Sequence, residues 1–177
     1  MIIDQENALV LIIDIQEKLL NAVFNKDIVE KKSKILVNAA TFLELPVFIT
    51  EQYPQGLGES IEGIKGYAEA FIKTDFNALS DKNLLNTLKC SGKSQVLVCG
   101  IETHICVHQT VSALINEGFE VVVVADACGS RSEYEYNMGL SVMEKAGANI
   151  KTIEMVLFEL LKTAKHQNFK QIQALIK

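Results

Sequence analysis

Three side chains in separate parts of the chain are of the types that carry out acyl transfer. Asp14 follows the apolar run at residues 8–13, Lys73 ends a short apolar segment, and Cys106 lies six residues beyond the apolar run at 95–100. Near the start of a helix, unpaired backbone N–H groups and the helix dipole stabilise a thiolate, and the same groups can hold an oxyanion. A carboxylate can accept the thiol proton, and an ammonium group can pair with that carboxylate and favour ionisation of the thiol. The pattern predicts a cysteine nucleophile assisted by an acid–base pair.

Each of these residues also has an ordinary structural explanation. Cys106 can be an inert thiol of the core, because buried cysteine is common. Asp14 can cap the helix that follows it, and Lys73 can extend its ammonium group to solvent. From the residues alone, both sets of roles stay open.

The elements that must bring these residues together follow from hydrophobic periodicity. Short apolar runs alternate with stretches of helical period, several of them ended by proline or glycine. This alternation predicts a three-layer α/β/α fold, with a mostly parallel six-stranded sheet covered by helices on both faces. The site is then expected beyond the carboxyl ends of the strands, where residues such as Asp14, Thr50 and Lys73 gather. The predicted strands cover residues 8–13, 47–50, 70–73, 95–100, 120–125 and 148–152, and the predicted helices cover 28–45, 80–89, 103–117, 132–146 and 169–176.

Length, composition and charge limit the class of protein. With 177 residues, 49% of them hydrophobic and 22% charged, the chain is predicted to form one domain over residues 1–177. The net charge is −5 and no basic run is present, so we expect no nucleic-acid partner. Acidic residues precede the run at 8–13, unlike the basic region of a secretory signal, and the run is too short to span a bilayer. Four cysteines without a CxxC pair fit a cytoplasmic protein with free thiols and no membrane contact.

The motifs around the three residues resemble a known superfamily. The segments DIQ at Asp14–Gln16, FIKT around Lys73 and GIETHICV at Gly100–Val107 resemble the isochorismatase-like cysteine hydrolases. That superfamily includes nicotinamidases, N-carbamoylsarcosine amidase and isochorismatase itself. The segments TEQYPQGLG at 50–58 and DACGSRS at 126–132 are similar to the isochorismatase-domain-containing proteins. The resemblance extends over nearly the whole chain, with the motifs in the expected order.

The resemblance implies a fold, a triad and a reaction. The implied strand order is 3-2-1-4-5-6, and the implied triad is Asp14, Lys73 and Cys106. A non-proline cis peptide is implied between Ile101 and Glu102, with the backbone N–H groups of Glu102 and Cys106 as oxyanion donors. Because true isochorismatases lack the cysteine, Cys106 implies the amidase-like branch, which hydrolyses small amides, ureides or related C–N carbonyl compounds through a thioester. A homo-oligomer acting on a small-molecule substrate is implied as well.

Four further residues are weaker candidates for contact with a substrate. Gln16 lies two residues past Asp14, where strand-like alternation places it on the same side. It can orient the triad, bind substrate or be a plain surface glutamine. Thr50, Gln52 and Tyr53 follow the second predicted strand and are pocket candidates on similar terms.

Two features near the predicted site have both a functional and an ordinary explanation. The glycine-rich segment Glu51–Tyr67 is longer than most connections and lies at the same edge of the sheet, which favours a lid over a tolerated surface loop. Arg131 can meet a carboxylate of a substrate or a neighbouring subunit, or it can be a solvated arginine.

No metal or cofactor is expected. Residues 50–67 contain no histidine, unlike the metal-binding region of nicotinamidases, and no GxGxxG motif follows a predicted strand. His104 and His108 have the spacing of a zinc-binding pair, but helical geometry turns both away from Cys106, toward solvent or a subunit interface. Two other classes of protein stay open. One is an inactive scaffold of the same fold, and the other is a redox-sensing thiol protein built on Cys106, with Cys128 as a second thiol.

Overall fold

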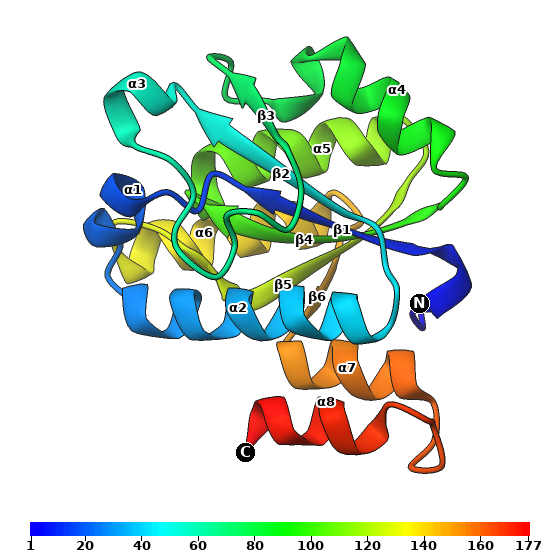
Figure 1. Ribbon diagram of the computed structural model, residues 1–177. Coiled ribbons are helices and arrows are strands. Elements are labelled where there is room, and N and C mark those ends of the chain that lie inside the picture. Colours follow the sequence, from blue (N-terminus) through cyan, green and yellow to red (C-terminus); the bar gives the residue numbers. More distant parts are fainter.

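The computed structural model describes all 177 residues, and its six strands form one sheet between layers of helices (Figure 1). Neighbouring strands all pair in parallel, in the order β3-β2-β1-β4-β5-β6. The predicted fold class and strand order are confirmed. The strands are β1 (Ala8–Ile13), β2 (Val47–Gln52), β3 (Ala70–Lys73), β4 (Gln95–Ile101), β5 (Glu120–Gly129) and β6 (Asn149–Lys151).

The central strand is β1, and its sequence suits burial on both faces. All six residues of ALVLII are buried, and the strand pairs with β2 on one side and β4 on the other. A continuous run of leucine and β-branched side chains is typical of a parallel strand covered by helices on both faces. Because Asp14 follows this run directly, β1 fixes it at the carboxyl edge of the sheet.

Helices cover both faces of the sheet. On one face α2 and α7 pack together with α8 outside them, and α4, α5 and α6 lie on the opposite face (Figure 1). None of the helices is both long and apolar enough to cross a membrane. The helices are α1 (Glu17–Ala22), α2 (Lys26–Phe42), α3 (Pro54–Leu57), α4 (Lys82–Cys90), α5 (His108–Asn116), α6 (Glu133–Lys145), α7 (Ile153–Leu161) and α8 (Phe169–Ile176), with 3₁₀ turns at Gln5–Asn7 and Ala78–Ser80 and a π-helix at Thr103–Val107.

The boundaries of several elements differ from the sequence-based prediction. β2 continues to Gln52 because its last two residues still pair with β3. β5 continues to Gly129, since its pairing with β4 resumes after a shift in register. The helix predicted at 103–117 is divided into the π-helix, which carries Cys106, and α5. Single π-helical turns are rare in proteins and are often found at functional sites.

Three helices were not predicted at all. α1 and α3 have six and four residues, too few for a periodic signal. α7 is longer, and its sequence does carry a helical signal, because its five buried residues recur at the spacing of an amphipathic helix: Ile153, Val156, Leu157, Leu160 and Leu161.

Gly100 allows β4 to approach β1 closely beside the site. Its φ is +148°, and a Cβ at this position would lie 2.1 Å from the carbonyl oxygen of Ile13. Only glycine adopts such a conformation in contact with a neighbouring backbone at no steric cost. The next residue is Ile101, and the Ile101–Glu102 peptide bond is cis in the structure.

Candidate active site

The site begins with a buried ion pair between two strand ends. The Nζ atom of Lys73 lies 2.6 Å from Oδ2 of Asp14, and the two side chains are only 4% and 0% exposed. The carboxylate of Asp14 caps no helix, because the N-cap residue of α1 is Gln16. Lys73 does not extend to solvent either. Both ordinary explanations offered by the sequence are wrong for these two residues.

Cys106 lies against this pair. Its thiol interacts with the carboxylate of Asp14 and with the backbone N–H of Glu102, and the residue is 7% exposed. Burial, then the negative charge of Asp14, raises the pKa of Cys106 to about 12, against the opposing effect of the Lys73 charge. The thiol is therefore protonated at neutral pH, unlike the helix-stabilised thiolate that the sequence suggested. The cause is that Lys73 is already neutralised by Asp14, while burial removes water from the sulfur.

Two of the four weaker candidates hold the ion pair in place. The hydroxyl of Thr50 donates a hydrogen bond to Oδ1 of Asp14 at 2.7 Å. The ammonium group of Lys73 donates to Oε1 of Gln52 at 2.6 Å and to the carbonyl oxygen of Asp75 at 3.1 Å. Because Thr50 is fully buried, it supports Asp14 and leaves no surface for a substrate.

The other two weaker candidates, Gln16 and Tyr53, shape the loop after β2. The side chain of Gln16 is fully buried; it accepts a hydrogen bond from the backbone of Gln52 and donates to the carbonyls of Gln52 and Gly58. Gln16 is thus no surface glutamine, and it clamps the segment that contains α3. Tyr53 opens that segment with a φ of +36° and leaves 54% of its surface exposed. Among the four, Tyr53 alone presents a large free surface.

A second charged cluster surrounds the side chain of Glu102, the residue whose backbone N–H acts on the Cys106 thiol. Nε of Arg131 lies 2.9 Å from Oε2 of Glu102. His104 places Nδ1 3.1 Å from the hydroxyl of Ser130, and its Nε2 is 3.9 Å from Glu102 and 3.7 Å from Glu135. No group of three or more His, Cys, Asp or Glu side chains is arranged to hold a metal ion.

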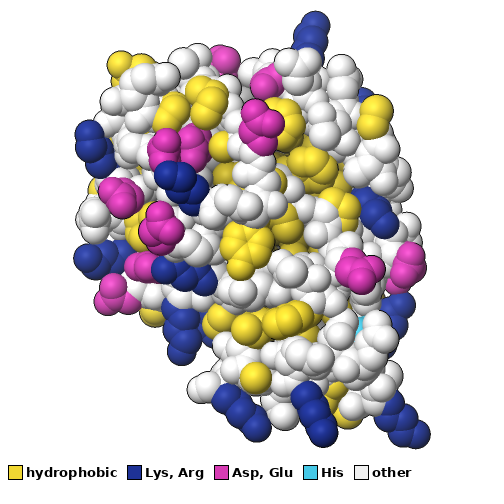
Figure 2. All heavy atoms as spheres, in the orientation of Figure 1, with side chains coloured by type: hydrophobic (Ala, Val, Ile, Leu, Met, Phe, Trp, Pro, Cys, Tyr) yellow, Lys and Arg dark blue, Asp and Glu magenta, His cyan; other side chains and the backbone are white.

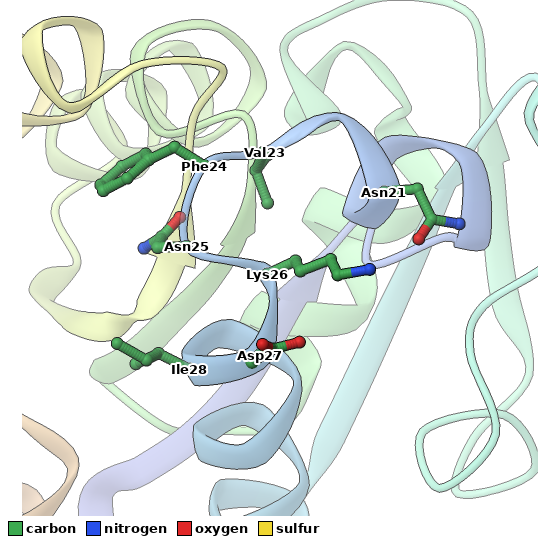
Figure 3. A pocket seen from close by; sticks show the side chains of 7 residues that line it. All are labelled: Asn21, Val23, Phe24, Asn25, Lys26, Asp27 and Ile28. Carbon is green, nitrogen blue, oxygen red and sulfur yellow. The ribbon is translucent and has the colours of Figure 1, made fainter.

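The hollows on the surface lie away from the triad. The one in Figure 3 has a volume of about 450 Å³ and lies between α1 and the start of α2. Of the two other hollows, one is bordered by β3, and the other is bordered by α1 together with residues 61–62. Asp14, Lys73 and Cys106 line none of the three. The residues that line the hollow in Figure 3 are Asn21, Val23, Phe24, Asn25, Lys26, Asp27 and Ile28.

A six-stranded parallel sheet in the order 3-2-1-4-5-6, with helices on both faces, places the chain among the isochorismatase-fold proteins. The chain belongs to the isochorismatase family, because the family model described as Isochorismatase domain matches residues 8–155. It is 37% identical to the Isochorismatase domain-containing protein 2 of Xenopus laevis, over 97% of this chain and 84% of that protein.

Solved structures share the fold over almost the full length. A structure described as MAR1 ribonuclease from Caenorhabditis elegans is 35% identical, with a TM-score of 0.93 over 99% of this chain and 92% of that one. The YcaC gene product of Escherichia coli, described as an octameric hydrolase of unknown specificity, is 27% identical. Its TM-score is 0.95, over 99% of this chain and 89% of that one.

Proposed function

We propose that this chain is a cysteine-dependent hydrolase of small amides, ureides or related C–N carbonyl compounds. One observation carries the proposal: the thiol of Cys106 is close enough to the carboxylate of Asp14 and to the backbone N–H of Glu102 for both to affect its pKa. A base on one side of a nucleophile and a hydrogen-bond donor on the other are the parts that acyl transfer requires. Membership of a family that includes hydrolases supports the same reaction class.

The first half of the reaction acylates the enzyme. Asp14 takes the proton of the Cys106 thiol while sulfur forms a bond to the carbonyl carbon, so the thiolate needs no independent existence at neutral pH. The carbonyl oxygen becomes an oxyanion, and the N–H groups of Glu102 and Cys106 stabilise it by about 3 kcal/mol each. The C–N bond then breaks, and Asp14 gives its proton to the departing nitrogen. The products of this half are a thioester and a free amine.

The second half restores the enzyme with one water molecule. Asp14 takes a proton from the water molecule while the water oxygen attacks the thioester carbon. The C–S bond breaks, the carboxylic acid departs, and the proton returns to the sulfur of Cys106. Throughout, Lys73 holds the carboxylate of Asp14 in place and compensates its charge.

The same site supports a homo-oligomer as the working form. None of the three hollows in the single chain is lined by the triad, and in a homo-oligomer a neighbouring subunit would complete the pocket there. The E. coli relative is described as octameric. Sedimentation of the purified chain at micromolar concentration measures its assembly directly, and a monomer that hydrolyses substrate would contradict this part of the proposal.

Three other classes compete with the amide hydrolase. An inactive scaffold requires no buried ion pair beside a thiol, and burying two charges costs desolvation free energy. A redox sensor requires an accessible, ionised thiol, whereas Cys106 is protonated and Cys128 is fully buried. The C. elegans relative is described as a ribonuclease, so RNA belongs in any test of substrates.

A substrate panel tests the proposal. Purified chain is incubated with small amides, ureides and a single-stranded RNA, and released amine, ammonia or nucleotides are measured. We expect turnover of an amide or ureide by the wild type and by Cys90→Ser, whose cysteine is exposed and remote in sequence, but none by Cys106→Ala. Rapid quenching should reveal Cys106 with the mass of an added acyl group. RNA cleavage that survives Cys106→Ala, with no amide turnover, would overturn the proposal.

A further inference from the structure

The charges around the Cys106 thiol are already balanced within the chain. From this balance we infer that the site takes an uncharged substrate, a small neutral amide or ureide, and discriminates against amides that carry a carboxylate or phosphate. The inference rests on the proposed function, since it names the substrate class for the same nucleophile. It depends on which cations near the sulfur have capacity left for an anion.

Lys73 has none. Its ammonium group has three N–H donors, and it has three acceptors: Oδ2 of Asp14, Oε1 of Gln52 and the carbonyl oxygen of Asp75. Its charge is balanced by Asp14, and its side chain is 4% exposed. An anionic substrate would have to displace Asp14, which the mechanism uses as the base.

Arg131 is the second cation, and Glu102 neutralises it. Its Nε lies 2.9 Å from the Glu102 carboxylate, while the backbone N–H of that same residue faces the Cys106 sulfur. A carboxylate that approached the sulfur from this side would meet the negative charge of Glu102 together with the positive charge of Arg131. The side chain of Arg131 is 61% exposed, so solvent weakens what attraction remains.

His104 adds no net positive charge that an anion could use. Its Nε2 already faces the carboxylates of Glu102 at 3.9 Å and Glu135 at 3.7 Å, so a protonated imidazole would be balanced by them. Lys73, Arg131 and His104 therefore provide no unpaired cation around Asp14 and Glu102. Burying an unpaired anion there is costly, whereas a neutral amide requires only hydrogen bonds for its carbonyl oxygen and nitrogen.

The charge preference can be measured without knowing the substrate, by alkylating Cys106 with two reagents of the same shape. Iodoacetamide is neutral and iodoacetate is anionic. Peptide mass spectrometry at pH 9 gives the rate of each reagent at Cys106 and at Cys90, which is exposed in the same chain and so reports the overall field of a protein with net charge −5. 2-Mercaptoethanol gives the intrinsic ratio of the two reagents.

We expect the iodoacetamide-to-iodoacetate rate ratio at Cys106 to exceed the ratio at Cys90 by about 100-fold, since burying an anion without an unpaired cation is costly. In Arg131→Gln the ratio at Cys106 should rise or stay the same. Equal ratios at Cys106 and Cys90 would overturn the inference. So would a faster reaction of iodoacetate that is lost in Arg131→Gln, because Arg131 would then be an anion-binding group.

A matched substrate pair separates this inference from the proposed function. Succinamide and succinamate differ only by an amide in place of a carboxylate, and we expect Cys106-dependent turnover of the neutral compound to be at least about 100-fold faster. Preferred turnover of succinamate would overturn the inference while upholding the hydrolase. Absence of turnover across the whole amide panel would count against the hydrolase, and the alkylation ratios would still decide the charge preference.

Discussion

The hydroxyl of Thr50 donates a 2.7 Å hydrogen bond to Oδ1 of Asp14, and neither side chain has any exposed surface. The contact joins the ends of two neighbouring parallel strands, since Thr50 pairs in register with Ile13, the last residue of β1. Lys73 holds the other carboxylate oxygen. Asp14 is thus fixed at both oxygens, and its remaining lone pairs are free for the thiol of Cys106.

Thr50→Val tests whether this contact matters for the reaction. Valine has nearly the shape of threonine but no hydroxyl, so Asp14 would lose one of its two fixed contacts. A hydrogen bond to a charged group contributes about 1.5–3 kcal/mol. We expect kcat on an active amide to fall roughly tenfold or more, while KM changes little because Thr50 does not reach the substrate. Thr50→Ser keeps the hydroxyl and should retain most of kcat. Equal loss in both variants would contradict the positioning role.

Gln52 should act in the same way on Lys73. Its Oε1 accepts a 2.6 Å hydrogen bond from the ammonium group, and Gln52→Leu would leave that buried donor unsatisfied. We expect a fall of about tenfold in kcat and a loss of roughly 1–3 kcal/mol in the free energy of unfolding. Gln52→Glu keeps an acceptor oxygen and should recover kcat. Urea denaturation and steady-state kinetics on the two variants decide the matter, and an unchanged kcat in Gln52→Leu would show that Lys73 needs no such support.

The sheet could be predicted from the sequence because its strands are continuous apolar runs separated by helical periods. Asp14, Lys73 and Cys106 could be proposed because each stands just beyond such a run or is matched by a family motif. The supporting roles of Thr50 and Gln52 could not be predicted. Thr50 lies beside Asp14, and Gln52 beside Lys73, only because of the register between β1, β2 and β3. No periodicity in the chain specifies a register between strands.

The protonation state of Cys106 could not be predicted from the sequence for a similar reason. Its place near the start of a helix suggested a stabilised thiolate. Burial of the sulfur and the nearby negative charge of Asp14 instead raise the pKa of Cys106 and keep the thiol protonated. Both causes are properties of the packed structure. The helix α7, by contrast, could have been predicted from the sequence, because its buried residues recur at intervals of three and four positions.

Gly100→Ala should be among the most damaging single substitutions in the sheet. The added Cβ would lie 2.1 Å from the carbonyl oxygen of Ile13, at a φ of +148° that other residues rarely adopt. Backbone strain and overpacking each cost about 1–3 kcal/mol, and here they act together. We expect a loss of about 3–5 kcal/mol in unfolding free energy, measured by denaturation.

A matched glycine separates the two causes. Gly118 also has a positive φ, +88°, but a Cβ there would meet nothing within 4 Å. Gly118→Ala should therefore cost only the backbone term of about 1–2 kcal/mol. If both variants lose the same stability, the close approach of β4 to β1 is not what requires glycine at position 100.

The alkylation rate of Cys106 should rise when its proposed base, Asp14, is removed. Desolvation and the negative charge of Asp14 raise the pKa of Cys106 to about 12, while the Lys73 charge lowers it. In the wild type, the rate with iodoacetamide should therefore increase about tenfold per pH unit between pH 8 and 11, without a plateau, because only the thiolate reacts. Asp14→Asn removes the opposing charge and leaves Lys73 uncompensated, so the pKa of Cys106 should fall and labelling at pH 8 should become faster.

Turnover should change in the opposite direction, since asparagine cannot accept the thiol proton, and we expect kcat to fall by about 10²–10⁴. Asp14→Asn also leaves a buried ammonium group without its partner, which costs about 3–5 kcal/mol in unfolding free energy. Circular dichroism and thermal unfolding must therefore show that the variant is folded at the assay temperature, and Asp14→Asn combined with Lys73→Met supplies a second, uncharged version. In that double variant both charges are gone, so the pKa of Cys106 stays high from burial and fast labelling should disappear. A folded Asp14→Asn protein that is labelled more slowly than the wild type would mean that Asp14 activates the thiol at rest, and the coupled proton transfer proposed for acylation would be wrong.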